Sequence, residues 1–227
     1  MGKKPAILQS ALGTFIHEAV TVDLKNNCLY LTEDVPDGGF YRFRASNALP
    51  DLTKGTLEIA KIKQRGGSSY IKWIPVPDPL ASKIPTRAQV SNSARFAGGE
   101  GIDIFQNKVY FTTKYDNRVW SYNTNNQKLR IIYDITTSHN PILKGVDNLI
   151  VTPAGDILVT EDMGNMQIIV ITPRNKIKPL IQIICHLNSV VTGPAFDPSF
   201  FRLYFSSQRG TSGKSSGGIT YEVSYVG

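Results

Sequence analysis

The sequence predicts an all-β chain built from a repeated unit. Short apolar runs alternate with turns along the chain, and helical spacing of apolar residues is weak throughout. Four of these runs resemble one another, and the last three follow at intervals of 48 and 46 residues. They lie at residues 29–32, 109–112, 157–160 and 203–206. A period of about 40 to 50 residues made of strands is typical of propeller blades, so the chain has room for about five blades.

Each predicted blade contains its strands in the same order. A first strand carries a polar or acidic residue near its start, and the similar apolar run follows after a turn rich in Asn or Gly. First strands are expected at 17–20, 99–102, 146–149 and 192–195, third strands at 39–43, 118–122, 167–171 and 219–223, and fourth strands at 129–133 and 178–183. We expect residues 1–227 to form a single domain.

The spacing between the first and second repeats is larger than the others. Residues 55–62 and 70–75 have strand-like sequences, and the interval is long enough for one long blade or two short ones. The proline-rich segment 77–85 is expected to be a loop, because proline cannot donate a ladder hydrogen bond. The segment 210–218 is rich in Gly and Ser and is also expected to be a loop.

The net charge of +7 favours anionic ligands through long-range steering. No aromatic-and-basic RNA signature or zinc finger accompanies the charge, so nucleic acid is not an expected partner. No stretch approaches the roughly 18 apolar residues of a membrane span, and the N-terminus lacks the apolar region of a signal peptide. The two cysteines, Cys28 and Cys185, lie in apolar runs and are expected to be buried strand thiols.

Acidic residues recur at matching places in the repeat. Glu18, Glu100 and Asp147 lie near the start of three first strands. Since equivalent positions of a propeller surround one axis, these carboxylates are expected to converge on a cation, and calcium takes six to eight oxygen ligands. Further acidic candidates follow two of the similar runs: Glu33, Asp34, Glu161 and Asp162. The alternative is that these carboxylates bond strand-end amides or cap turns.

The order of these motifs resembles that of the PhoX-type alkaline phosphatases. The matching motifs are His17-Glu18-Ala19-Val20, Thr32-Glu33-Asp34, Gly99-Glu100-Gly101, Val109-Tyr110-Phe111-Thr112, Asp147-Asn148, Thr160-Glu161-Asp162 and Gly193-Pro194-Ala195-Phe196-Asp197-Pro198, and the resemblance covers residues 11–225. It implies a six-bladed propeller with a calcium and iron cluster in its channel that hydrolyses phosphate monoesters. It also implies that the N-terminal part of the family domain is missing here. Members of the family are typically exported.

Carried over residue by residue, the resemblance makes Glu18 and Glu100 metal ligands. Two positions depart from the family pattern. Gly98 stands where the family carries an arginine that binds phosphate. The family also has an iron-binding cysteine upstream, and no cysteine precedes His17 in this sequence. Arg209 or Arg118 would have to supply the missing positive charge, and Arg209 is therefore a candidate substrate-binding residue.

Three functions agree with the sequence. The first is a calcium-dependent phosphatase of the PhoX type, with weak or absent activity in this chain alone. The second is a calcium-dependent lactonase-type hydrolase, for which Asn148 would be a substrate-binding residue. The third is a non-catalytic propeller that acts as a binding module.

The ends of the chain bear on the closure of the propeller. Residues 5–12 are expected either to add the last strand to the blade that holds 219–223 or to leave an open sheet edge. An open edge presents unpaired backbone groups, so a partner chain or a second copy would be expected to cover it.

Overall fold

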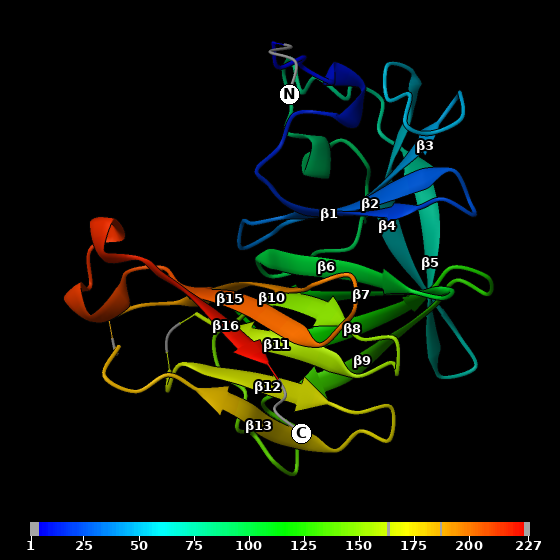
Figure 1. Ribbon diagram of the computed structural model, residues 1–227. Helices are drawn as coiled ribbons and strands as arrows, with labels where there is room; N and C mark the ends of the chain where they lie inside the picture. The colour runs from blue at the N-terminus through cyan, green and yellow to red at the C-terminus, as the bar shows by residue number, and fades with distance from the viewer. Residues whose placement is uncertain (1–4, 163, 187, 225–227) are drawn as a thin grey trace.

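The computed structural model describes residues 5–162, 164–186 and 188–224 (Figure 1). The first part of the N-terminus, in which the sequence shows no signal peptide, includes Lys3 and Lys4. These two residues lie outside the described residues. The described strands are β1 His17–Asp23, β2 Cys28–Glu33, β3 Phe40–Ala45, β4 Gly55–Arg65, β5 Ser68–Pro75, β6 Gly99–Phe105, β7 Lys108–Thr113, β8 Arg118–Asn123, β9 Lys128–Asp134, β10 Val146–Val151, β11 Ile157–Glu161, β12 Gln167–Ile171, β13 Ile177–Gln182, β14 Val191–Phe196, β15 Arg202–Ser207 and β16 Ile219–Ser224. Short 3-10 helices are η1 Ser10–Leu12, η2 Thr86–Ala88, η3 Gly210–Ser212 and η4 Ser215–Gly217. The all-β prediction is confirmed.

The strands pair antiparallel with their neighbours in sequence and form four blade-like units in the described part of the chain. These units are β1–β4, β6–β9, β10–β13 and β14–β16. β5 extends the first unit, and its residues Ser69 and Tyr70 pair with Leu129 and Lys128 of β9, which joins the first two units into one nine-stranded sheet. The count is lower than the expected five because residues 55–75 form a long hairpin on the first unit instead of a blade of their own.

The first strands of the four units lie next to one another in the order β1, β6, β10 and β14, with β1 and β14 at the two ends of the row. Apolar clusters hold adjacent units together. Phe40, Tyr30 and Trp73 of the first unit pack against Phe111 and Tyr122 of the second. Because burial of such clusters is the main favourable term in folding, the packing between units also sets where the first strands begin.

Two further clusters hold the later units. Tyr110 and Tyr133 pack against Val146, Leu149 and Ile157 between the second and third units. A last cluster joins the third and fourth units, and its members are Leu158, Met166, Ile168, Val191, Leu203 and Phe205.

The N-terminal segment covers the first unit and does not complete the last one. Ala11 and Leu12 of η1 pack against a core cluster that contains Leu57. β16 pairs with β15 alone among the described strands, so the last unit has an open edge. Of the two expected outcomes for residues 5–12, the structure therefore has the second.

The two cysteines differ in environment. Cys28 is buried in β2, as predicted, whereas Cys185 is exposed. The prediction for Cys185 is wrong because β13 ends at Gln182 and Cys185 then adopts a left-handed φ of 63° in the following loop. No helix in the described residues is long and apolar enough to cross a bilayer.

Candidate metal centre

The first strand of each unit has an irregular register near its start. The pairing shifts occur between His17 and Val20, Gly99 and Ile102, Val146 and Leu149, and Thr192 and Ala195. Such bulges turn a side chain away from the regular alternation of a strand. Glu18, Glu100 and Asp147 lie within the first three bulges, and Thr192 takes the corresponding place in the fourth unit, since Val191 pairs with Ser207 as His17 pairs with Glu33.

Threonines at the ends of the second strands fix the acidic residues of the next unit. The Thr32 hydroxyl donates a hydrogen bond of 2.6 Å to the carbonyl oxygen of Glu100, and the Thr112 hydroxyl donates one of 2.5 Å to that of Asp147. Gly101 permits this close approach, because a Cβ there would lie 2.5 Å from the backbone nitrogen of Leu149. The repeated threonine therefore positions two of the three acidic residues.

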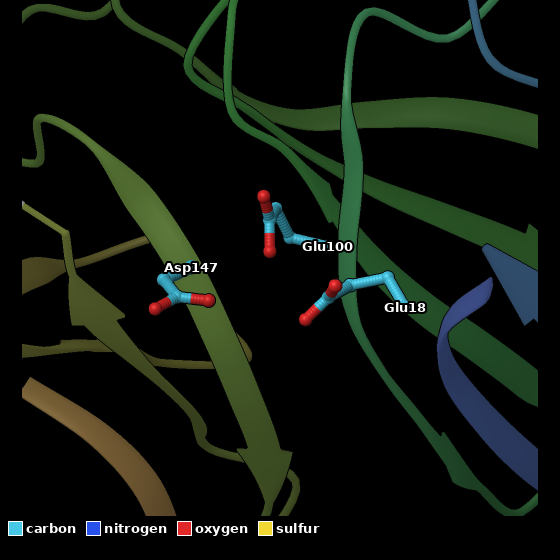
Figure 2. A group of neighbouring side chains, drawn as sticks. All are labelled: Glu18, Glu100 and Asp147. Atoms are coloured by element: carbon cyan, nitrogen blue, oxygen red, sulfur yellow. The ribbon is translucent and has the colours of Figure 1, made fainter. Parts of the chain in front are cut away.

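The three carboxylates converge on one space, as Figure 2 shows. One oxygen from each of Glu18, Glu100 and Asp147 lies within 4.8 Å of the others. Oxygens on opposite sides of a calcium ion are about 4.6–5.2 Å apart, given metal–oxygen distances of about 2.3–2.6 Å. Glu100 and Asp147 are buried and Glu18 is exposed, so the group opens to solvent on the Glu18 side. The spacing and the oxygen donors fit a hard divalent cation.

The Lys114 ammonium lies beside two acidic residues at this centre. Glu100 is only 2% exposed, and its Oε1 atom forms an ion pair with that ammonium. The same ammonium lies 3.4 Å from Asp34 Oδ2, while Asp34 Oδ1 is buried without a partner among the residues described. An unpaired buried carboxylate oxygen such as Asp34 Oδ1 is costly, and a cation bound beside it would satisfy it.

Burial and mutual repulsion favour the protonated forms of these carboxyl groups. Burial, together with the charges of Asp147 and Asp34, raises the pKa of Glu100 to about 8, although Lys114 acts in the opposite direction. Burial and the charges of Asp162 and Glu18 raise the pKa of Asp147 to about 6. The pKa of Glu18 is also raised, first by burial and then by Asp34.

These shifts predict a pH dependence. Between about pH 5 and pH 8 the folded chain holds protons on these carboxyl groups that the unfolded chain has released, so the free energy of unfolding of the metal-free chain falls as the pH rises. Calcium binds the deprotonated groups, so its affinity is expected to rise from about pH 6 to about pH 9. Calorimetric calcium titrations and urea unfolding at several pH values measure the two trends. A calcium affinity that stays constant over this range would contradict the prediction.

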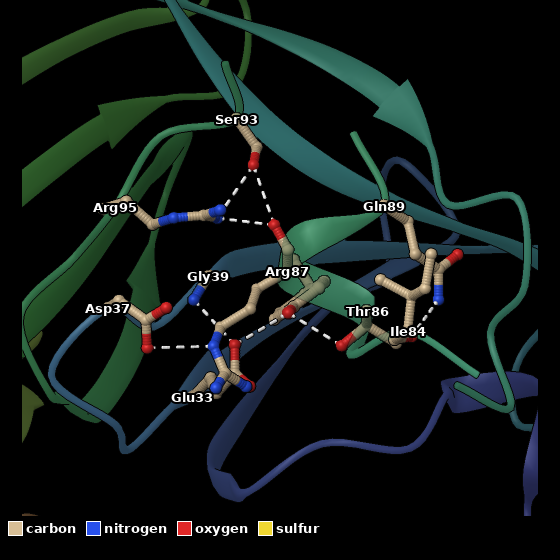
Figure 3. A network of polar contacts seen from close by, with 10 residues as sticks. Glu33, Asp37, Gly39, Ile84, Thr86, Arg87, Gln89, Ser93 and Arg95 are labelled. Atoms are coloured by element: carbon tan, nitrogen blue, oxygen red, sulfur yellow. Dashed lines mark hydrogen bonds and ion pairs between the residues drawn. The ribbon is translucent and has the colours of Figure 1, made fainter. Parts of the chain in front are cut away.

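Glu33 and Glu161 lie at the last position of their second strands and are engaged in hydrogen bonds there. Glu33 accepts a hydrogen bond of 2.8 Å from the Gly39 amide and pairs with Arg87 at 3.1 Å (Figure 3). It also accepts one of 2.8 Å from the Tyr41 hydroxyl. Glu161 accepts hydrogen bonds of 3.0 Å from the backbone amides of Lys144 and Gln167. Neither belongs to the group of three. Both accept hydrogen bonds from backbone amides near the strand end, which is the alternative that the sequence left open for them.

Asp34 and Asp162 occupy the next position of the repeat, at the edge of the carboxylate group. The charge of Asp34 raises the pKa of Glu18, and that of Asp162 raises the pKa of Asp147. Both residues are therefore near enough to affect the three central carboxyl groups without joining them.

The two predicted substrate-binding residues have other surroundings. The Asn148 side-chain oxygen accepts hydrogen bonds of 2.8 Å from the Thr192 hydroxyl and the Gly193 amide, and its side-chain nitrogen donates one of 2.9 Å to Asp147 Oδ1. Asn148 thus joins the third and fourth units and orients Asp147. Arg209 precedes η3, and its backbone amide donates to Ser189 Oγ at 2.8 Å. Its guanidinium makes no hydrogen bond or ion pair with a described residue.

Neither Arg209 nor Arg118 supplies a positive charge to the group of three carboxylates. Arg118 pairs with Asp116 at 2.9 Å and with Asp134 at 2.7 Å. Gly98 has a φ of 71°, and a Cβ there would lie 2.5 Å from the Tyr115 ring, so an arginine at this position would require both strain and movement of Tyr115.

Lys114 supplies that charge, and the sequence interpretation missed it. The repeat itself contains the signal, because one residue follows each second strand at an equivalent place. These residues are Asp34, Lys114, Asp162 and Gln208, and each backbone amide donates to the carbonyl of the residue just before the first strand of the same unit. Alignment of this position would have placed Lys114 beside the acidic group.

The chain resembles known proteins in sequence and in fold. The family model "Alkaline phosphatase PhoX" matches residues 3–141, and the chain belongs to this family. The structure of Pseudomonas fluorescens PhoX in complex with vanadate, a transition state analogue, matches with a TM-score of 0.70 and 16% identity, covering 88% of this chain and 49% of that chain. The likeness confirms the predicted propeller-type fold, and this chain spans about half the length of that phosphatase.

More distant structures also match. A luciferin-regenerating enzyme has a TM-score of 0.48 and 16% identity over 96% of this chain and 94% of its own. A gluconolactonase from Xanthomonas campestris has a TM-score of 0.40 and 10% identity over 84% of this chain and 69% of its own. No curated protein matches the chain in sequence.

Proposed function

We propose that this chain binds a calcium ion through Glu18, Glu100 and Asp147, and that this centre takes part in the hydrolysis of phosphate monoesters. At the level of the family, the activity is that of an alkaline phosphatase. The observation that carries the proposal is the convergence of three carboxylates from three units, with one oxygen of each within 4.8 Å of the others.

Each residue has a distinct part in this proposal. Glu100 and Asp147 hold the cation from the buried side, Asn148 keeps Asp147 in place, and Glu18 completes the group at the side open to solvent. A bound calcium ion would polarise a phosphoryl oxygen and lower the pKa of a coordinated water molecule. The positive charge of Lys114 reduces the electrostatic repulsion among the carboxylates of Glu18, Glu100 and Asp147.

The donor set favours calcium over iron. All three side chains offer carboxylate oxygens, which suit hard cations, whereas thiolates suit softer metals. Cys28 is buried in β2, Cys185 is exposed in a loop, and neither belongs to the group of three. The described residues therefore do not fit an iron site with a cysteine ligand.

The alternatives have less support. The lactonase-type function relied on Asn148, whose side-chain oxygen already accepts two hydrogen bonds. Because residue 98 is a glycine and supplies no guanidinium to bind phosphate, we propose that the chain binds calcium but hydrolyses phosphate monoesters only weakly. A purely non-catalytic module would bind calcium with no turnover at all.

Turnover of p-nitrophenyl phosphate by the purified chain tests this function. We expect slow hydrolysis in calcium that stops when a chelator is added and returns when calcium is restored. The variant Glu18→Gln should reduce the rate, while Glu222→Gln, which changes an exposed residue of β16, should not. Hydrolysis that is insensitive to the chelator would place the chemistry elsewhere, and calcium binding without turnover would favour the binding module.

A further inference from the structure

Lys114 projects into the acidic centre from the end of β7. Its backbone amide donates a hydrogen bond of 2.8 Å to the carbonyl oxygen of Gly98. Gly98 directly precedes β6, the strand that carries Glu100, so this bond holds Lys114 next to the start of β6. Its side chain reaches Glu100 Oε1 and lies 3.4 Å from Asp34 Oδ2, so it connects the second unit to the first. The side chain is 24% exposed and can be reached from solvent.

The charge of Lys114 acts on the whole centre. It lowers the pKa values of Glu18, Glu100 and Asp147 against the opposing effect of burial. Burial in turn works against the charge of Lys114 itself, but the carboxylates of Glu100 and Asp34 outweigh it and raise the pKa of Lys114.

A metal ion and the ammonium would compete for the same Glu100 oxygen. Lysine carries a compact charge on a flexible four-carbon stem and is a common phosphate ligand. The Lys114 side chain is partly exposed, so its flexible stem lets the ammonium turn toward the solvent side of the centre when a cation takes the Glu100 oxygen.

We propose that Lys114 is the oxyanion-binding residue of this centre: it neutralises Glu100 in the metal-free chain and grips the phosphoryl oxygens of a dianionic phosphate monoester once a cation occupies the carboxylates. This inference rests on the proposed function. It assigns recognition of the substrate's charge to the residue directly after β7, a lysine at the repeat position that Asp34 and Asp162 hold in other units.

The test compares binding of two probes, calcium alone and inorganic phosphate at saturating calcium, by calorimetry. Lys114→Met removes the charge and keeps the length of the side chain. We expect it to tighten calcium binding by about threefold or more, because a competing cation is gone, and to weaken phosphate binding by about tenfold or more. Lys114→Arg should bind phosphate within about threefold of the wild-type chain.

Lys108→Met is the matched control. Lys108 is the exposed first residue of β7, the strand that directly precedes Lys114. It should change neither affinity. If Lys114→Met does not fold, Lys114→Gln serves for the same comparison.

The outcomes separate this inference from the proposed function. Unchanged phosphate affinity in Lys114→Met, with calcium binding retained, overturns the role of Lys114 and leaves the calcium centre standing. A wild-type chain that binds calcium but not phosphate also overturns the role of Lys114 and leaves the calcium centre standing. A wild-type chain that does not bind calcium overturns both.

Discussion

Replacing Glu100 by Gln is expected to weaken calcium binding by about 100-fold or more, since even residues that only support metal ligands are worth about 10- to 100-fold in affinity. Glu100 is the most buried member of the group and lies between Glu18 of the first unit and Asp147 of the third. The substitution keeps the size of the side chain and removes one charged ligand. Calorimetric titration with calcium at about pH 8, where much of Glu100 is ionised, measures the change.

Glu222→Gln is a suitable control for this prediction. Glu222 is an exposed glutamate of β16 whose carboxylate lies 3.8 Å from Arg202. Its replacement removes the same charge from the chain without touching the centre, so calcium affinity should stay at the wild-type value. Equal calcium affinities for Glu100→Gln and Glu222→Gln would mean that the cation binds elsewhere.

Phe40→Ala is expected to lower the free energy of unfolding by about 3–5 kcal/mol, as for other buried phenylalanines. Phe40 is fully buried and lies between the first two units. Its ring stacks on Phe111 with centroids 4.4 Å apart and meets Phe96 and Trp73 at 5.9 Å and 5.4 Å. Urea unfolding followed by tryptophan fluorescence measures the loss.

The same substitution connects packing to the centre. Glu18 belongs to the first unit and Glu100 to the second, so a loosened contact between the units should also weaken calcium binding. Phe201→Ala is the control, because Phe201 is 72% exposed and its loss should change stability by less than about 0.5 kcal/mol. Similar unfolding curves for the two variants would show that the aromatic cluster does not hold the units together.

Much of the strand arrangement could be predicted because it depends on local sequence. The buried second strands β2, β7, β11 and β15 correspond to the four apolar runs that resemble one another. The acidic positions at the start of the first strands were also accessible, since the repeat aligns Glu18, Glu100 and Asp147 before any contact is known. The bulges that turn these side chains inward recur at the same place in every unit.

The rest depends on contacts between segments far apart in the sequence. Glu33 is a metal-ligand candidate in the sequence, and in the folded chain its carboxylate pairs with Arg87 and accepts a hydrogen bond from the Gly39 amide (Figure 3). The extension of the first unit by β5 requires the pairing of Tyr70 with Lys128, which no local pattern indicates. A pattern of acidic residues does not reveal Lys114, because it stands at the repeat position where Asp34 and Asp162 carry the opposite charge.

A crystal structure of the chain grown with calcium tests the shared centre most directly. We predict one calcium ion bonded, at about 2.3–2.6 Å, to oxygens of Glu18, Glu100 and Asp147 together. The Lys114 ammonium should then have left Glu100 Oε1. Crystals saturated with calcium that hold no ion between these three carboxylates, or hold it at another place, would contradict the assignment of the metal centre.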